Sequence, residues 1–187
     1  FKIDIVTFTK FIKSFDPQFI FSPIDVLMVN SSIYIYRFVP LGSLADKIYQ
    51  NYNPKENYYK KLVSMNNKNG LPLCAGEIIT YGEQILNALI YLHKFGIYHG
   101  NIHSGNILLD GNAKITDTHS SLLDYTHRDM KFFMSIAEIE NEFQIDILGF
   151  GTVLYEMIYG QFPSTSFEPA IGAFWTNYEI GNKKIIL

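Results

Sequence analysis

Residues 97–118 read IYHGNIHSGNILLDGNAKITDT, and this stretch decides the fold. Two short apolar segments, Ile107–Leu109 and Ala113–Thr116, flank the turn Asp110-Gly111, which predicts two strands joined by a tight turn. A polar loop, residues 99–106, comes directly before the first strand. Because rigid elements often present chemistry on a connecting loop, we expect the functional site here.

Hydrophobic spacing on both sides of this stretch predicts helices. Apolar residues recur at helical spacing over Ala75–Phe95, and Gly96 supplies the stop. The segment Phe143–Tyr159 is apolar nearly all round, which is typical of a buried central helix. At the N-terminus, Phe1–Phe15 has helical spacing with one buried face and ends before Pro17.

Shorter elements are expected between these helices. Val26–Val29 and Ile33–Phe38 predict a hairpin of two strands, and Leu44–Tyr49 predicts a short helix. Asn51–Gly70 is rich in Asn, Lys and Tyr and has weak periodicity, so we expect an exposed excursion, with a binding role for its tyrosines as the alternative. The last segment, Gln161–Leu187, has a loosely helical pattern.

The composition is that of an ordinary globular protein, since 48% of the 187 residues are hydrophobic and 18% are charged. This balance excludes a disordered chain, and a net charge of −3 implies no basic surface for nucleic acid. No apolar run approaches the roughly 18–20 residues needed to span a bilayer. Cys74 is the single cysteine, so a reducing compartment is expected, and we expect Cys74 to be a small buried residue.

Three motifs, in this order, resemble those of a protein kinase domain. Residues 99–106, HGNIHSGN, match the framing of the catalytic-loop motif H-R-D-L-K-x-x-N, with His99 and Asn106 identical. Asp117 stands where the kinase pattern places the metal-binding Asp of D-F-G, although the tripeptide here is DTH. Residues 146–160, DILGFGTVLYEMIYG, are similar to the motif of the helix that anchors the large lobe.

The words HGNIHSGNILLDG, DTH and LYEMIYG most resemble the PX-domain kinase-like and Slowpoke-channel-binding proteins, a pseudokinase-type group of the protein-kinase-like superfamily. The resemblance spans roughly residues 1–165 and implies an α+β, protein-kinase-like fold. It implies a partial small lobe in residues 1–38, made of one helix and two strands. It implies a large lobe in residues 39–187, with the excursion at 51–70 and a truncated C-terminal end.

The same resemblance implies that the positions for proton and phosphate chemistry are degenerate. Asn101 occupies the place of the catalytic Asp, and a neutral amide cannot act as a general base, a role worth about 10²–10⁴ in rate. His103 replaces the loop Lys and would be mostly neutral near pH 7, while Gly100 replaces the Arg that receives an activation-loop phosphate. Asp146 is implied to bond to the loop backbone, and His99 to pack beneath the loop.

Asn106 and Asp117 are, by resemblance, the retained pair for Mg²⁺, since one amide oxygen and one carboxylate suffice when phosphates and water complete the shell. An equal alternative is structural: Asn106 holds the loop by hydrogen bonds, and Asp117 caps the next turn. The positions implied for ATP are Tyr36 at the gatekeeper place, Phe38 and Val39 in the hinge, Leu108 against the adenine, and Asn106 and Asp117.

The resemblance implies a binding or scaffold module for protein partners, such as a membrane transporter or channel. It implies a cytoplasmic location, with any membrane association carried by regions outside this chain, and no direct membrane insertion. Two alternatives stay open: an atypical Ser/Thr kinase that binds ATP and Mg²⁺ with weak phosphotransfer, and an interaction domain that never binds nucleotide.

Overall fold

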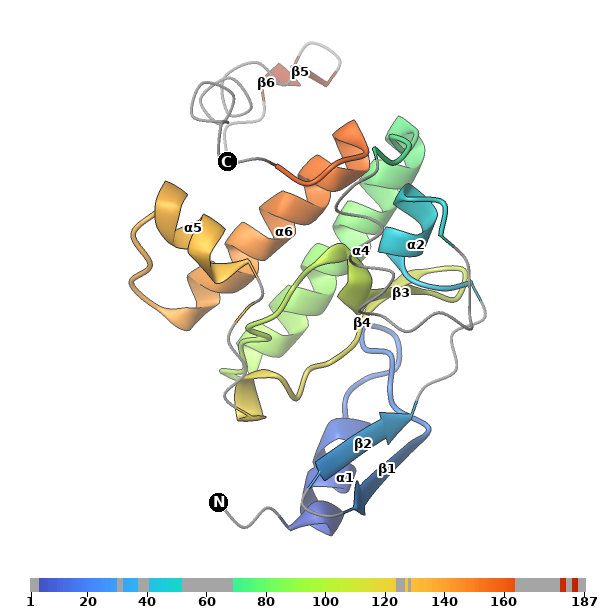
Figure 1. The fold of residues 1–187 in the computed structure, drawn as a ribbon, viewed down its shortest axis with the longest axis vertical. Helices are drawn as coiled ribbons and strands as arrows, with labels where there is room; N and C mark the ends of the chain where they lie inside the picture. Colours follow the sequence, from blue (N-terminus) through green and yellow to red (C-terminus); the bar gives the residue numbers. More distant parts are fainter. Residues whose placement is uncertain are drawn as a thin grey trace.

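The computed structural model describes residues 4–29, 32–36, 41–51, 69–123, 127, 129–163, 179–180 and 183–184. Two long helices, α4 (Ala75–Lys94) and α6 (Glu142–Tyr159), lie side by side in its main body (Figure 1). A shorter helix, α5 (Met130–Ile136), contacts α6. The two long helices form the frame on which the site is built.

A two-stranded hairpin packs against α4. Its strands β3 (Ile107–Leu109) and β4 (Ala113–Ile115) are antiparallel, with Leu108 opposite Lys114. The short helix α2 (Leu44–Ile48) contacts β3 and the 3₁₀ turn η1 (Ser104–Asn106) that leads into it. The polar loop is therefore fixed at both of its ends, by α4 before it and by the hairpin after it.

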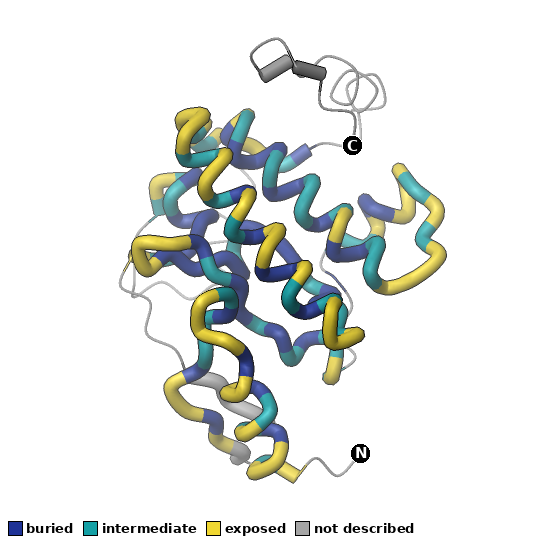
Figure 2. Tube along the Cα trace, turned by 180° about the vertical axis from the view of Figure 1, so that it is seen from behind, coloured by how far each residue is buried: buried dark blue, intermediate teal, exposed yellow. Residues whose placement is uncertain are grey.

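The main core lies between α4, α6, α2 and this hairpin. Figure 2 shows the buried positions facing the interior along both long helices, with exposed positions on the outside. Burial of such a continuous apolar cluster is the main force that holds the elements together. Its completely buried members include Leu44, Ile48, Ile85, Ala88, Leu92, Ile102, Ile107, Ile115, Val153 and Met157.

A second, smaller unit is formed by the N-terminal elements. Helix α1 (Ile5–Lys13) packs on the antiparallel hairpin of β1 (Asp25–Val29) and β2 (Ser32–Tyr36), with Asp25 opposite Tyr36. Phe8 and Ile12 of α1 form a separate apolar cluster with Val26. The N-terminal unit lies at one end of the molecule, at the bottom in Figure 1.

The chain between α1 and β1 connects this unit to the main body. Phe21 donates its backbone N–H to the carbonyl of Ile115 (2.8 Å), and Ile115 donates to the carbonyl of Phe19 (3.2 Å). The ring of Phe19 stacks on Tyr91 of α4, with ring centroids 5.0 Å apart. The segment therefore adds a strand-like pairing to the edge of β4.

The helix ends are closed by local contacts. Asp4 caps α1, and its carboxylate accepts from the Thr7 hydroxyl and the Val6 N–H, which lowers the pKa of Asp4. Gly160 ends α6 at φ +68°, and a side chain there would place a Cβ 2.6 Å from the carbonyl oxygen of Gly70. Gly160 thus serves both the left-handed turn and the close approach of the two backbones.

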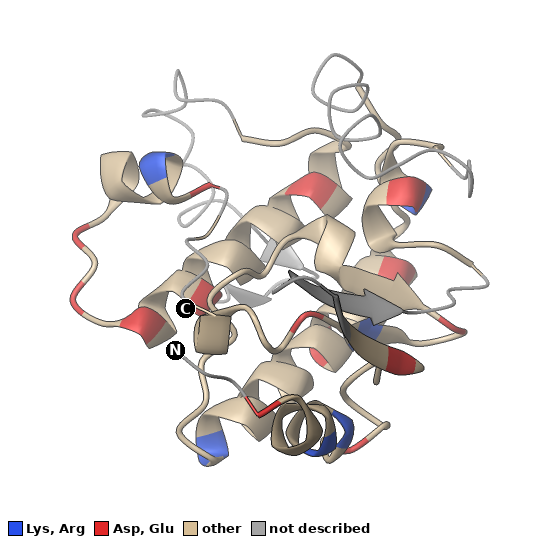
Figure 3. Cartoon of the chain, turned by 60° about the horizontal axis from the view of Figure 1, so that its bottom comes forward, with Lys and Arg blue, Asp and Glu red and all other residues tan. Residues whose placement is uncertain are grey.

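Charged side chains are distributed unevenly over the described surface. Lys10 and Lys13 stand in the last turn of α1, where a cation is favourable next to the free carbonyls of the helix end. Exposed acids stand along the loop after α5 and at the start of α6 (Figure 3); they are Glu138, Glu140 and Glu142. Within the described ranges, no helix is long and apolar enough to cross a membrane.

Most predicted elements are confirmed, with shifted bounds. The expected Ala75–Phe95 helix is α4, whose C-cap is Phe95, and the two expected hairpins are β1–β2 and β3–β4. The N-terminal helix is shorter than the predicted Phe1–Phe15, because Asp4 caps it and Ser14 ends it. Most of the expected excursion, residues 52–68, lies outside the described part of the chain.

Two expectations were wrong. Cys74 is exposed, because it precedes α4 at the surface, where its N–H donates to Glu77 (3.3 Å). Helix α6 is not buried all round, since the Ile147 side chain is 52% exposed. In the last segment, β5 (Glu179–Ile180) and β6 (Lys183–Lys184) form an antiparallel pair, while most of the loosely helical stretch, residues 164–178, lies outside the described residues.

Candidate functional site

The loop of residues 99–106 is held by Asp146, which projects from α6 beneath it. The Asp146 side chain is completely buried and accepts the backbone N–H of His99 at Oδ2 (2.8 Å) and that of Gly100 at Oδ1 (2.7 Å). Gly100 lies at φ +75°, a conformation that a residue without Cβ adopts at little cost. The loop therefore enters the site in a conformation fixed by two charge-assisted hydrogen bonds.

His93, near the end of α4, is a third partner of this carboxylate. Its Nε2 lies 2.9 Å from Asp146 Oδ2. A buried carboxylate is stable only when its lone pairs are satisfied, because removal of the ion from water costs several kcal/mol. Nothing in the sequence indicated His93, since the contact joins residues that are far apart in the chain.

The ring of His99 connects the loop to the end of β4. Nδ1 accepts the backbone N–H of Asn101 (3.2 Å), and Nε2 lies 2.6 Å from the carbonyl oxygen of Thr116. Since Nδ1 accepts a hydrogen bond, the neutral ring carries its proton on Nε2 and donates it to Thr116. Because His99 is completely buried, this arrangement agrees with the structural role that the resemblance implied.

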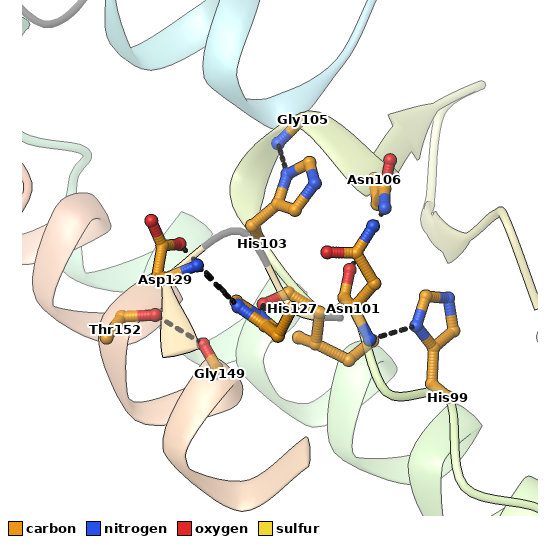
Figure 4. Close-up of polar contacts among 10 residues, drawn as sticks. His99, Asn101, His103, Gly105, Asn106, His127, Asp129, Gly149 and Thr152 are labelled. Carbon is orange, nitrogen blue, oxygen red and sulfur yellow. Dashed lines mark hydrogen bonds and ion pairs between the residues drawn. The ribbon is translucent and has the colours of Figure 1, made fainter. Parts of the chain in front are cut away.

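Asn101, at the place of the catalytic base, presents an amide oxygen with no donor. Its Oδ1 is buried and has no hydrogen-bond partner among the described residues. Figure 4 shows the Asn101 side chain directed toward the space between His103 and Asn106. A buried acceptor without a donor costs about 1–3 kcal/mol, so an N–H or O–H group of a ligand would be favoured at this point.

His103, at the place of the loop Lys, is used within the loop itself. The side chain is buried, and Nδ1 accepts the backbone N–H of Gly105 (3.1 Å), which caps the turn η1. A ring that accepts at Nδ1 is neutral, and so it brings no positive charge to a phosphate. The loss of a cation at this position stays a prediction.

Asn106 and Asp117, the implied metal pair, are brought together by the hairpin. The backbone N–H of Thr116 donates to the carbonyl of Asn106 (2.9 Å), so the residue after Thr116 follows directly beside Asn106. Asp117 lies at φ +63°, which is uncommon for a residue with a side chain and typical of functional positions. Its carbonyl accepts the N–H of Ser120 (3.0 Å).

The Asn106 side chain has an amide nitrogen and an amide oxygen. One can hold the loop by a hydrogen bond while the other stays available for a metal ion, so the structural and the metal-binding roles are compatible. Nδ2 donates to the backbone carbonyl of Asn101 (3.0 Å), which holds the loop. An amide oxygen and the Asp117 carboxylate are both ligands that Mg²⁺ prefers, so the donor set fits this ion. Among the described residues, no group of three or more His, Cys, Asp or Glu could hold a metal ion.

The positions implied for the adenine end are only partly described. Leu108 is buried and bridges to Ser43, while Leu109 donates its N–H to the carbonyl of Gly42 (3.0 Å). Tyr36 ends β2, and nothing of its side chain is described. Phe38 and Val39 lie outside the described residues. Their roles in nucleotide binding stay predictions.

His119 makes an aromatic contact between the main body and α1. Its ring lies edge-on to Phe8, with centroids 6.3 Å apart, and Leu123 packs on the same apolar cluster. Thr118, at the place of the Phe of D-F-G, is buried and has no ring. The aromatic contact that the motif lacks at position 118 is thus supplied one residue later, a substitution that the sequence pattern did not indicate.

The family comparison agrees with these features. A family model described as "Protein kinase domain" matches residues 4–173. In the solved structures, a mutant of the kinase domain of Mycobacterium tuberculosis PknI matches with a TM-score of 0.54 and 14% identity, over 86% of this chain and 57% of that one. This likeness shows the fold and confirms the α+β, kinase-like architecture.

Curated relatives have more specific names. A mouse PX domain-containing protein kinase-like protein is 37% identical over 146 residues, which cover 75% of this chain and 25% of the relative. The Slowpoke-binding protein of Drosophila melanogaster is 35% identical over 155 residues, or 76% and 28% of the two chains. A probable inactive serine/threonine-protein kinase of Dictyostelium discoideum is 34% identical over 122 residues, or 64% and 19%. The chain spans about a quarter of the length of the first two.

Proposed function

Because the chain belongs to the protein kinase family, we propose that it is a kinase-like domain without efficient phosphoryl transfer that works as a binding or scaffold module. The observation that carries the proposal is Asn101. The loop around it is held in place by Asp146 and His99, yet the side chain at the base position is an amide, which cannot accept the proton of a substrate hydroxyl.

The chemistry of the neighbouring positions supports the same conclusion. His103 accepts a backbone N–H at Nδ1, so its neutral ring adds no positive charge for a transferring phosphate. The name of one relative includes "probable inactive" kinase, and others are called kinase-like. The altered positions would remove proton transfer and phosphate stabilisation together, whereas the fold stays intact.

We also propose that ATP and Mg²⁺ bind at the retained positions. Asn106 and Asp117 would hold the ion, while Leu108 would contact the adenine, with Tyr36, Phe38 and Val39 beside it. When bound, Mg²⁺ supplies charge neutralisation of the phosphates. The unpartnered Oδ1 of Asn101 would orient a nearby hydroxyl or ammonium group by accepting a hydrogen bond.

The proposed partners are proteins, in membrane-protein trafficking or the regulation of a channel. The support is the name of the Slowpoke-binding protein, with which the chain shares 35% identity. We place the domain in the cytoplasm, with any membrane association supplied by other regions of a longer protein. The exposed acids Glu138, Glu140 and Glu142 after α5 do not favour nucleic acid at that part of the surface.

A second candidate is an atypical Ser/Thr kinase with weak phosphotransfer. The left-handed backbone of Asp117 favours it, because strain of this kind is kept where a side chain must be aimed at a ligand. In this function Asn101 would orient the substrate hydroxyl without removing its proton. The two candidates share the nucleotide site and differ in the rate of transfer.

Thermal unfolding of the full-length protein with ATP, with and without Mg²⁺, tests the nucleotide site. Ligand at about 100 times its dissociation constant should add roughly 2.7 kcal/mol of stability and raise the midpoint. We expect a Mg²⁺-dependent rise that Asp117→Ala abolishes. The exposed acid Asp110 provides the matched control, because Asp110→Ala should leave the rise unchanged. No rise in the parent protein would leave a scaffold that binds no nucleotide.

A further inference from the structure

His127 joins the segment that follows Asp117 to the loop that carries Asn101 and Asn106. Its ring is 2% exposed, and Nε2 lies 2.8 Å from the backbone carbonyl oxygen of Ile102. Nδ1 accepts the backbone N–H of Asp129 (3.0 Å). Since Nδ1 is an acceptor, the proton of the neutral ring is on Nε2 and is donated to Ile102.

The space for this ring is built by three elements. On the α5 side, the centroid of the His127 ring lies 4.6 Å from that of Phe133. On the loop side, the His103 ring is edge-on to it, with centroids 6.3 Å apart. On α6, a Cβ at Gly149 would lie 2.6 Å from the Ile102 carbonyl oxygen and 3.4 Å from His127 Nε2. Figure 4 shows His127 between the loop and Gly149. The helix therefore has no side chain at the point where loop and ring meet.

The held carbonyl belongs to the middle of the functional loop. The peptide between Ile102 and His103 cannot rotate while its oxygen accepts from His127, because rotation would leave a buried acceptor without a donor. The position of this peptide also determines the next hydrogen bond, in which the His103 carbonyl accepts the N–H of Asn106 (2.8 Å). A displaced Ile102–His103 peptide would move the turn η1 and, with it, Asn106.

We propose that His127 is a positioning residue that fixes the loop of residues 99–106 to the segment after Asp117 through the Ile102 carbonyl. The contact consists of uncharged hydrogen bonds and ring packing, so it orders the loop without a phosphate group. The effect of His127 on ligand binding rests on the proposed nucleotide site. Its effect on the order of the loop is independent of that site. Within the described part of the chain, the Asp129 carboxylate lies 3.9 Å from Nδ1 of the ring.

Two variants of His127 separate the hydrogen bond from simple packing. His127→Phe keeps the ring and its volume but removes the donor to Ile102. His127→Gln places an amide N–H near the position of Nε2 and keeps the donor. Hydrogen exchange at the amides of Gly105 and Asn106 is the readout, because neither amide bonds to His127 itself. The amides of α4 in the same samples show whether the fold persists.

We expect exchange at Gly105 and Asn106 to rise about tenfold in His127→Phe and to stay near the parent rate in His127→Gln, with α4 unchanged. Ring ¹⁵N shifts of the parent should show the neutral tautomer with the proton on Nε2. Equal exchange in parent and His127→Phe, equal loss of protection in both variants, or a neutral ring protonated on Nδ1 would overturn the proposal.

The nucleotide response of the same proteins distinguishes this inference from the proposed function. If ATP and Mg²⁺ raise the parent midpoint, the rise should shrink in His127→Phe and persist in His127→Gln. A rise of equal size in His127→Phe contradicts the link to the site. If the parent shows no rise, the proposed nucleotide site fails, while the exchange comparison still decides whether His127 orders the loop.

Discussion

Asp146 shows at the scale of one residue how the loop acquires its shape. Its carboxylate is fully buried and bonds to two backbone N–H groups and to His93, so every contact depends on its two oxygens. A side chain of the same shape with an NH₂ group in place of one oxygen would direct a donor at another donor. The loop conformation is therefore tied to the ionised carboxylate and not to its volume.

Asp146→Asn is expected to lower the free energy of unfolding by about 2–4 kcal/mol, because it leaves buried donors without an acceptor. Urea unfolding measures this change. Asp110→Asn is the matched control, since Asp110 is exposed. Its carboxylate contacts Lys114 (2.8 Å) and accepts the N–H of Asn112 (3.4 Å) at the surface, so the substitution should cost less than about 1 kcal/mol. Equal effects of the two substitutions would contradict the role assigned to Asp146.

At the residue scale, the sequence predicted candidate positions for the chemistry and two residues that hold the loop, but not the histidines that complete these contacts. His99, Asn106, Asp117 and Asp146 follow from motif spacing, and the contacts of His99 and Asp146 agree with their implied roles. His93 and His127 were missed, because their contacts join residues far apart in the chain and a lone histidine has no local pattern. The prediction that Cys74 is buried was wrong, because its exposure depends on where α4 begins.

At the scale of elements, α6 carries two glycines with opposite surroundings. Gly149 lies against the Ile102 carbonyl, where a Cβ would approach to 2.6 Å, whereas a Cβ at Gly151 would meet nothing within 4 Å. Both lie inside the helix, where glycine costs about 0.5–1 kcal/mol relative to alanine. The two positions thus separate the backbone effect from the steric one.

Gly149→Ala is expected to destabilise the protein by about 1–3 kcal/mol, since the loop must move away from the helix. Gly151→Ala should stabilise it by about 0.5–1 kcal/mol through helix propensity alone. Denaturant unfolding of both variants checks the pair. A neutral or stabilising Gly149→Ala would mean that the loop does not lie as close to α6 as described.

The contact between α4 and α2 gives a pH-dependent prediction. Lys47 Nζ lies 2.7 Å from Glu77 Oε1, and this contact lowers the pKa of Glu77 below its ordinary value. A lowered pKa in the folded state contributes stability above the unfolded pKa, and the contribution is lost as the pH falls through the folded pKa.

Glu77→Gln should therefore reduce the free energy of unfolding by up to about 1 kcal/mol at pH 7, and the difference should disappear as the pH falls through the lowered pKa of Glu77 in the folded state. Unfolding curves at several pH values measure it. Glu83→Gln, at an exposed position of the same helix, should show no such dependence. A difference for Glu77→Gln that grows as the pH falls would contradict the assignment.

The elements themselves were largely predictable. Helix α4 and both hairpins follow from periodicity and turn residues, because their patterns are set by one buried face. Helix α5 was not predicted, since it is short; its two buried residues, Phe132 and Phe133, pack with Ile145 of α6. The pairing of β5 with β6 involves only two residues a strand, too few for a pattern.

For the whole molecule, the contact between the N-terminal unit and the main body determines how α1 lies relative to the site. The unit has its own apolar cluster around Phe8, Ile12 and Val26. His119, two residues after Asp117, packs edge-on against Phe8. A ligand that fixes Asp117 would therefore also restrict the position of α1.

His119→Ala is expected to loosen α1, because an aromatic pair contributes about 0.5–1.5 kcal/mol beyond its buried area. Hydrogen exchange of the α1 amides should become faster, while exchange in α4 stays the same. His119→Phe keeps an aromatic ring and should restore slow exchange. Unchanged protection of α1 in His119→Ala would show that the contact with Phe8 does not couple the two units.

Phosphate transfer tests the central claim most directly. The full-length protein is incubated with radiolabelled ATP, Mg²⁺ and a generic protein substrate, and the transfer rate is compared between the parent and Asp117→Ala. Because Asn101 cannot accept the substrate proton, we predict the same background rate for both proteins. Robust phosphorylation by the parent that Asp117→Ala abolishes would contradict the account and identify an active kinase.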